Sequence, residues 1–398
     1  MVRSRFYSLL IGCVTFTFVI ALIVDSETSF EASMRGMTMW WEIVFPTLLP
    51  FFIMSELLLA FGVVHFIGTL VEPVMRPLFR VSGSGGFVWI LGMASGYPAG
   101  ARFTLRLWER GDISTTEAER LVAFTNAANP SFLVGAVAVG FFHEPALGVL
   151  LLIAHYSANA LVGISMRFYG KTPSLAHKKG RVSLMVAFER MHQNRIKELR
   201  PIGEILSDAV ESSVRTLLMV GGFMIFFSVV VELATSLQAL VLLSQFLHII
   251  TSLAGLPQAM DSAIVAGLFE MTLGANLISQ TTGVTLKEQA IAASFVLGCS
   301  GLSIQAQVAS MLAKTPIRLT PFFFARLLHG LLAALLTYLL WPFLNIEANM
   351  ETSRSVVASP LESFTFSHFG WVEVLCTFLL IFTVLRSLNR QRQPRKTI

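Results

Sequence analysis

Two apolar segments at corresponding positions of the chain's two halves are interrupted where a simple membrane span would stay uniform. The first, 86–102, reads GFVWILGMASGYPAGAR, and the second, 263–276, reads AIVAGLFEMTLGAN about 175 positions later. Inside a bilayer, irregular backbone is tolerated only where protein or a water-filled cavity surrounds it. Breaks at corresponding positions of two halves are a strong indication of a transport site. The pair therefore predicts a membrane protein with an internal binding site.

The composition agrees with a chain that lies mostly in the membrane. Hydrophobic residues make up 54% of it and charged residues only 13%, about half the charged fraction of soluble domains. The three cysteines lie in or beside apolar segments, so neither a disulfide framework nor a thiolate metal site is expected. Without a P-loop, a metal-ligand cluster or a nucleophile elbow, we expect no enzyme, no catalytic residue, no metal, no cofactor and no ATP-driven pump.

The hydropathy pattern predicts an all-α polytopic integral membrane protein with about 10–12 hydrophobic segments. A span needs ~20 apolar residues. The candidate segments are 6–24, 40–62, 64–81, 86–104, 120–141, 145–167, 213–234, 237–256, 259–281, 287–312, 319–343 and 370–388. Two adjacent pairs, 64–81 with 86–104 and 237–256 with 259–281, are each either two crossings or one re-entrant hairpin, and both alternatives return the chain to the side it left.

Basic residues set the expected orientation. The longest hydrophilic loop, 170–200, carries eight lysines and arginines, and the C-terminal tail ends RSLNRQRQPRKTI. Lys and Arg are retained on the cytoplasmic side and need no nucleic-acid partner to explain them. With the N-terminus inside, both of these regions are cytoplasmic, whereas the loops 25–39 and 345–367, which are acidic on balance, lie outside. We therefore predict cytoplasmic N- and C-termini.

The order of features repeats along the chain. Segment 40–62 pairs with 213–234, the two ambiguous pairs match each other, 119–141 pairs with 288–312, and 145–167 pairs with 319–343. Each unit has an odd number of crossings, which predicts two inverted repeats with interrupted or re-entrant helices. The expected divisions are an N-terminal span and outside loop (1–39), a first repeat (40–167), a basic cytoplasmic loop with an amphipathic helix or a solvated linker (168–212), a second repeat (213–343), and an outside loop, last span and basic tail (344–398).

The first candidate binding element is the loop between Ser95 and Arg102. Gly96 and Gly100 permit unusual backbone angles and Pro98 removes a donor. Amide groups left free in such a loop can hold an anion, and Tyr97 adds an aromatic surface. Arg102 supplies a permanent positive charge, and its guanidinium group can donate bidentate hydrogen bonds. The alternative is a packing kink with Arg102 extended to the cytoplasmic interface.

A second polar group interrupts segment 120–141. Asn126 and Asn129 are three positions apart, and Thr125 and Asn129 four, beside a proline and Ser131. Helical spacing would place these polar groups on one face. Unsatisfied polar groups at membrane depth are costly, so we expect Asn126, Asn129 and Ser131 to bind a ligand. Contacts between helices are the alternative.

The second half carries a carboxyl group at its own break. Glu270 lies mid-segment, with Thr272 and Asn276 four positions apart close by. An acid at membrane depth is a functional candidate by default. Glu270 is expected to bind a coupling proton or cation, or to balance a cation such as Arg102 or Arg215. A structural ion pair or a neutral acid is the alternative.

A further break follows at Cys299. Ser300, Ser303 and Gln307 would share one face of a continuous helix and are candidate ligands, with Cys299 a small apolar filler. Isolated histidines show no ligand spacing and are expected to be structural or interfacial. These are His65, His155, His248 and His329.

Several of these motifs together carry a family resemblance. WWEIVFPTLLPFFIMSELL, GYPAGAR, TNAANPSF, LFEMTLGAN and PFFFARLLH resemble the YlbJ (SpoVV) family of sporulation integral membrane proteins, over roughly residues 5–345. The resemblance implies two Gate, or nucleoside-recognition, units and a distant similarity to concentrative nucleoside transporters. It also implies export of dipicolinic acid from the mother cell across the outer forespore membrane.

The expected function is therefore secondary transport of a small organic anion. Dipicolinate, a planar aromatic dianion, requires amide donors, a cation and an aromatic surface, all of which the loop of residues 95–102 offers. A nucleoside or purine transporter, in which Glu270 couples ion binding, and a non-transporting sporulation scaffold are the alternatives. Expected partners are the anionic substrate and the lipid bilayer, and a homo-oligomer is compatible with the pattern.

Overall fold

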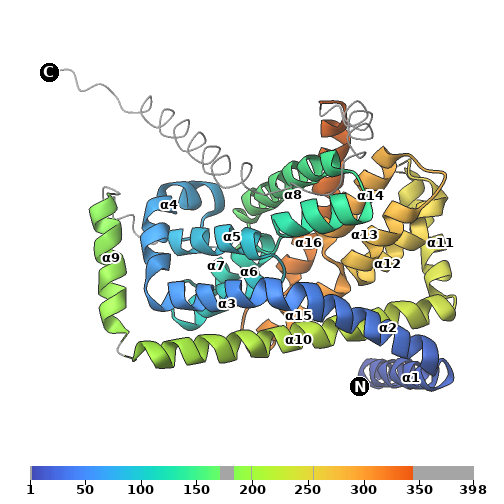
Figure 1. Ribbon diagram of the computed structural model, residues 1–398, viewed down its shortest axis with the longest axis horizontal. Helices are drawn as coiled ribbons and strands as arrows, with labels where there is room; N and C mark the ends of the chain where they lie inside the picture. Colours follow the sequence, from blue (N-terminus) through green and yellow to red (C-terminus); the bar gives the residue numbers. More distant parts are fainter. Residues whose placement is uncertain (1, 171–182, 199, 254, 344–398) are drawn as a thin grey trace, which may run out of the picture. The chain divides into compact units, whose positions relative to one another are not determined.

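The computed structural model describes residues 2–170, 183–198, 200–253 and 255–343, and these residues form helices and no strand. The predicted last span, 370–388, the loop 345–367 and the C-terminal tail lie outside the described residues. The all-α prediction is confirmed (Figure 1). The helices are α1 (Val2–Val24), α2 (Ser26–Met39), η1 (Trp40–Val44), α3 (Phe45–Ala60), α4 (Val63–Phe79), α5 (Gly83–Ser95), α6 (Ala99–Glu109), α7 (Thr115–Thr125), η2 (Phe132–Phe141), α8 (Pro145–Met166), α9 (Leu184–Lys197), α10 (Ile202–Ser236), α11 (Ala239–Leu253), η3 (Gln258–Met260), α12 (Asp261–Phe269), α13 (Met271–Gln280), α14 (Leu286–Cys299), α15 (Gly301–Leu312), α16 (Thr320–Leu340) and η4 (Trp341–Phe343).

Within the described residues, four to six stretches are long and apolar enough to cross a membrane. The four single stretches are α8, α10, the α14–α15 segment and the α16–η4 segment. Two bent pairs add to them: α1 with α2, bent by 99°, and α3 with α4, bent by 83°. These helices agree with an integral membrane protein.

The predicted segment 86–104 is a helical hairpin instead of one span. Its helices α5 and α6 have 13 and 11 residues, roughly 20 and 17 Å at the rise of an α-helix, which is too short for each to cross ~30 Å of hydrocarbon. The chain folds back at Gly96. As a result, Gly92 and Gly100 lie so close that a Cβ on Gly92 would be 3.3 Å from the Cα of Gly100. The tip contains a cis peptide bond between Tyr97 and Pro98.

The segment 259–281 forms a second, shorter hairpin. Helices α12 and α13, of 9 and 10 residues, meet at Glu270. A Cβ on Gly274 would lie 2.0 Å from the Cα of Gly267, so the two helices approach closely enough that only glycine fits. Each half therefore contains one hairpin of half-length helices.

An interrupted helix follows each hairpin. Matching capping boxes begin the two helices: Ser114 with Glu117 at α7, and Thr285 with Glu288 at α14. The first helix breaks over 126–129 before it continues into η2, and the second breaks at Ser300, whose φ is +64°. Uninterrupted helices, α8 and α16, come next and pack against each other. The order of elements is thus the same in both halves, while their inversion stays a prediction.

Of the helix expected over 197–212, the part from Ile202 onward is helical and leads directly into the second half. Residues from Ile202 onward already belong to α10, a single helix of 35 residues, about 52 Å long, that packs along α2 and α3 (Figure 1). Just before α10, Arg200 donates hydrogen bonds of 2.8 and 2.9 Å to the two carboxylate oxygens of Glu198 and so lowers the pKa of that carboxyl group.

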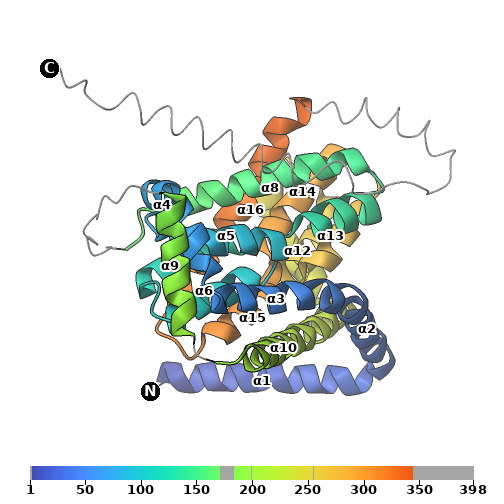
Figure 2. The same ribbon diagram turned by 60° about the vertical axis from the view of Figure 1, so that its left-hand side comes forward.

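Helix α9, in the basic loop, packs against α4 (Figure 2).

Candidate functional site

The tip of the first hairpin lies against the break in the first interrupted helix. The amide oxygen of Asn126 accepts a hydrogen bond of 3.1 Å from the backbone N–H of Ala101. The amide of Asn129 donates to the Ser95 carbonyl at 3.2 Å and accepts from the Phe132 N–H at 2.7 Å. Both predicted asparagine ligands therefore bond backbone groups that the two breaks leave free.

The expected helical face for Asn126 and Asn129 is wrong, because residues 126–129 are not helical. Pro130 disfavours the α conformation of the residue before it and has no N–H of its own. The predicted break at Cys299–Ser300 is present, since Ser300 has left-handed backbone angles, and Ser300 therefore does not extend the helical face of Ser303 and Gln307. On α15, Ser303 and Gln307 do share a face, and Gln307 donates to the Ser303 hydroxyl at 3.4 Å.

Arg102, on α6 of the first hairpin, forms an ion pair with a carboxylate of α3. Its Nη2 lies 2.9 Å from Glu56 on α3 and 3.2 and 3.3 Å from the hydroxyls of Ser212 and Ser213 on α10. Arg106 shares the same carboxylate at 3.1 Å. The Arg102 side chain is buried instead of extended to the surface, and no described residue forms a hydrogen bond with its Nη1.

Glu270 pairs with neither of the cations named for it from the sequence. Its carboxylate accepts a hydrogen bond of 2.7 Å from the Leu273 N–H and so caps the first turn of α13. Arg102 pairs with Glu56, and Arg215 pairs with Glu211 at 2.8 Å. The described residues thus place Glu270 at a helix N-terminus, where a carboxylate is favoured.

The two halves contact each other through side chains that cap broken helices. Arg326 on α16, fully buried, donates to the carbonyls of Ala123 and Asn126, where α7 ends, each at 2.5 Å. In the opposite direction, the Tyr97 hydroxyl donates to the Leu297 carbonyl near the end of α14, at 3.0 Å. Free carbonyls at a helix C-terminus attract such donors and cations.

Two histidines lie between the same helices. The rings of His155 on α8 and His329 on α16 have centroids 4.4 Å apart. The Nε2 of His155 lies 3.0 Å from the Ala128 N–H, and the Nε2 of His329 lies 2.9 Å from the His155 carbonyl. An amide N–H only donates and a carbonyl only accepts. We therefore assign the proton of His155 to Nδ1 and that of His329 to Nε2.

We call these buried residues the inter-half cluster. It consists of Tyr97, Asn126, His155, Cys299, Ser300, Arg326 and His329, each at most 8% exposed. Four of its atoms have no hydrogen-bond partner among the described residues: Arg326 Nε, His155 Nδ1, His329 Nδ1 and Ser300 Oγ. Buried polar atoms almost always have partners, so this concentration makes the cluster the candidate binding site.

The charge of the inter-half cluster is positive. No carboxylate among the described residues forms an ion pair with Arg326, whereas Arg102, also buried, has Glu56. An isolated buried charge is costly unless something of opposite charge offsets it. A small anion bound beside Arg326 would offset this charge, so the cluster is the candidate anion site.

Sequence reasoning identified part of this cluster. Tyr97, Asn126 and Ser300 were candidates, whereas Arg326, His155 and His329 were not. The sequence does contain a feature that identifies Arg326. It is a charged residue inside the apolar segment 319–343, and a charge at membrane depth is a functional candidate by default.

Several other sequence candidates make local contacts. Asn276 accepts from Gln280 at 3.1 Å, and Ser131 is exposed. Thr272, in the first turn of α13, is buried. Of the hydrogen bonds seen for these three residues in the described part of the chain, none reaches the inter-half cluster.

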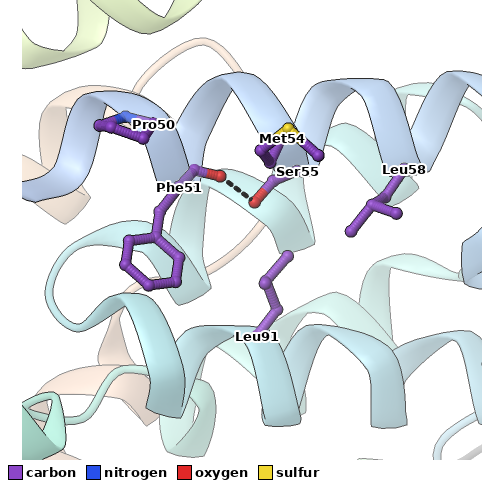
Figure 3. A pocket seen from close by; sticks show the side chains of 6 residues that line it. All are labelled: Pro50, Phe51, Met54, Ser55, Leu58 and Leu91. Atoms are coloured by element: carbon purple, nitrogen blue, oxygen red, sulfur yellow. Dashed lines mark hydrogen bonds between the residues drawn. The ribbon is translucent and has the colours of Figure 1, made fainter. Parts of the chain in front are cut away.

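A surface groove between α3 and α5 has different chemistry (Figure 3). It has a volume of about 270 Å³ and is lined by Pro50, Phe51, Met54, Ser55, Leu58 and Leu91. Its one hydroxyl, on Ser55, donates to the Phe51 carbonyl. With an almost wholly apolar lining, the groove offers nothing to an anion.

Comparison with known proteins places the chain among membrane proteins of sporulation. Residues 41–145 and 217–315 match the family described as Gate, nucleoside recognition. The chain is 51% identical over 342 residues to the sporulation integral membrane protein YlbJ of Bacillus subtilis (strain 168), a match that covers 85% of this chain and 84% of the relative. It is 33% identical over 110 residues to an uncharacterized protein of Alkalihalophilus pseudofirmus, covering 27% of this chain and 23% of the relative. No solved structure matches the chain.

The matched Gate segments contain the hairpins and the interrupted helices of both halves. His155, Arg326 and His329 lie beyond the ends of those segments. The broken helices thus lie within the segments that match the family, whereas Arg326, His155 and His329 come from α8 and α16, outside those segments.

Proposed function

The chain belongs to the family of sporulation integral membrane proteins that carry Gate, nucleoside-recognition, domains, and from this premise we propose that it is a secondary transporter of a small organic anion. The proposed substrate is dipicolinate, exported from the mother cell across the outer forespore membrane. We propose that it acts without catalysis, with both termini in the cytoplasm.

One observation carries the proposal: no carboxylate of the described residues pairs with Arg326, which lies where the broken helices meet. Around it lie three buried hydrogen-bond donors that have no partner within the residues the structure describes: Arg326 Nε, His155 Nδ1 and the Ser300 hydroxyl. A carboxylate accepts several such donors at once, and charge-assisted hydrogen bonds are about twice as strong as neutral ones. A neutral nucleoside would leave the arginine charge uncompensated.

The shape of dipicolinate also fits the cluster. Its flat aromatic ring needs an aromatic neighbour, and Tyr97, His155 and His329 supply three rings. The broken helices allow such a ligand to reach backbone groups, since their ends carry carbonyls and amides without partners inside the same helix.

Uptake by proteoliposomes tests the proposal. We expect saturable uptake of labelled dipicolinate, unaffected by excess nucleoside, and at least a tenfold loss in the variant Arg326→Gln, because a charge-assisted bond is lost. Arg215→Gln is the matched control, since its side chain is 80% exposed. Nucleoside uptake without dipicolinate uptake would establish the nucleoside alternative. Transport of neither would favour a scaffold.

A further inference from the structure

We propose that His329 takes up a proton when an anion binds beside Arg326, so that the protein carries a proton together with each anion. This inference rests on the proposed function, because it names the ion coupled to the transported anion. It assigns the coupling to α16, whereas the sequence alone pointed to Glu270.

The hydrogen bonds of His329 leave one ring nitrogen able to receive a proton. Its Nε2 must carry hydrogen, because the partner is the carbonyl oxygen of His155, 2.9 Å away. In the neutral ring, Nδ1 therefore has a free lone pair. This Nδ1 is buried and has no hydrogen-bond partner in the described part of the chain. A proton can add there without breaking any existing hydrogen bond.

His155 has no equivalent site. Its Nε2 already accepts the N–H of Ala128 at 3.0 Å, and its proton is on Nδ1. A second proton on Nε2 would point at the amide hydrogen of Ala128 and replace an attraction with a repulsion. Of the two stacked rings, His155 is therefore a donor to the anion, and His329 is the proton acceptor.

The surroundings of His329 contain positive charge and no carboxylate partner among the described residues. Arg326 lies three positions earlier on α16, and so on the same side of the helix. From the packed elements, α8 contributes His155 and Tyr156, α14 contributes Cys299, and the first hairpin contributes Tyr97.

The acidic and basic residues of the other packed helices are engaged elsewhere. On α7, Glu119 accepts from the Tyr169 hydroxyl and from the Arg318 N–H, and Arg120 donates to the carbonyls of Arg80 and Tyr169. Glu117, also on α7, accepts from the N–H groups of Ser82 and Ser114. On α14, Lys287 lies over the ring of Tyr338, and Glu288 accepts from the Thr285 N–H. None of these groups has a described contact with His329.

This arrangement links the two binding events. Without an anion, a proton on His329 would put a second positive charge beside Arg326 in a buried site, which is unfavourable. An anion at Arg326 offsets that charge and favours protonation of the ring. The linkage is reciprocal, so protonation also tightens anion binding.

Calorimetry measures the proton directly. Dipicolinate is titrated into the purified full-length protein at pH 7 in buffers of different ionisation enthalpy, and the dependence of the heat on the buffer gives the protons bound. We expect about one proton per anion in the wild type. We expect almost none in His329→Gln, whose side-chain amide still donates to the His155 carbonyl but has no basic nitrogen. His248→Gln, on α11, is the control that retains proton uptake.

The outcomes separate the two proposals. Dipicolinate binding without proton uptake in the wild type overturns this inference and leaves the anion transporter intact, whereas absence of dipicolinate binding overturns both. Loss of proton uptake in Glu270→Gln but not in His329→Gln assigns the proton to Glu270 and also overturns it. If His329→Gln fails to fold, wild-type proteoliposomes decide: we expect an acidic exterior to accelerate dipicolinate uptake, and an unchanged rate contradicts the proposal.

Discussion

The hydroxyl of Tyr97 donates a 3.0 Å hydrogen bond to the carbonyl of Leu297, which lies 200 positions later in the chain. Arg326 forms the reverse connection to the carbonyl of Asn126, also across 200 positions. Each half thus caps the broken helix of the other. Because a free carbonyl at a buried helix end needs a donor, movement of the first hairpin's tip or of α16 would leave a carbonyl of the opposite half without its donor. This reciprocity gives the two halves a physical connection at the proposed anion site.

Removal of the Tyr97 hydroxyl is expected to weaken this connection measurably. Tyr97→Phe leaves the buried Leu297 carbonyl without its donor, which costs about 1–3 kcal/mol. Thermal unfolding of the purified protein checks the loss. Tyr338→Phe is the control, because Tyr338 is 53% exposed, and we expect a change below about 0.5 kcal/mol. Equal stability of the two variants would show that the Tyr97 bond contributes nothing.

The Glu56–Arg102 pair is expected to matter more than an exposed ion pair. Glu56→Gln leaves the Arg102 guanidinium, 5% exposed, without its carboxylate, and breaking a buried pair in this way costs about 3–5 kcal/mol. Glu211→Gln breaks an exposed pair with Arg215 and should cost less than about 1 kcal/mol. Denaturant unfolding compares them.

A double variant separates the ion pair from packing. Because Glu56→Gln combined with Arg102→Gln removes the uncompensated charge, we expect it to be more stable than Glu56→Gln alone. A double variant that is less stable than the single one would contradict the ion-pair explanation and point to the packing of Arg102 on Phe52, 4.5 Å away.

The second hairpin is expected to tolerate no side chain at its crossing point. The added Cβ of Gly274→Ala would lie 2.0 Å from the Cα of Gly267, so α12 and α13 must separate, and we expect loss of folded protein in the membrane fraction. At Gly222 on α10 nothing lies within 4 Å of an added Cβ. Gly222→Ala should therefore accumulate normally and gain up to about 1 kcal/mol from helix propensity. Normal accumulation of Gly274→Ala would show that the hairpin crossing is not tight.

Local sequence signals were sufficient to predict where helices form and where they break. Apolar runs define the helices, and Gly96, Pro98, Pro130 and Glu270 all stand at or next to the observed interruptions. These features depend on a residue and its immediate neighbours, which is why a single sequence reveals them.

The details of the breaks depend on contacts that local patterns do not contain. In the two hairpins Gly92 lies against Gly100 and Gly274 lies against Gly267. A glycine in a sequence does not indicate which other residue will lie against it. Similarly, Arg102 contacts the carboxylate of Glu56, although Glu56 lies 46 positions earlier in the sequence. The types of residue at the site were predictable from the sequence, but the contacts between residues far apart in the sequence were not.

The histidines illustrate the same limit. His155 and His329 each looked like a lone histidine, because 174 positions separate the two groups joined by their hydrogen bond. Their pairing arises from the packing of α8 on α16. A rule applied to single positions, such as the cost of a charge at membrane depth, still identifies Arg326 within its apolar segment.

Labelling of introduced cysteines tests whether the two halves are inverted. In a background with Cys13 and Cys376 replaced by serine, which leaves the buried Cys299, Glu109→Cys and Thr282→Cys place exposed thiols shortly before α7 and α14, the two helices that begin with matching capping boxes. The positive-inside rule predicts that position 109 is cytoplasmic and position 282 is outside. A membrane-impermeant maleimide should therefore label Thr282→Cys in intact cells and Glu109→Cys only after permeabilisation. Labelling of both positions from the same side would show that the repeats are parallel, and the hairpins would then enter the membrane from one face instead of two.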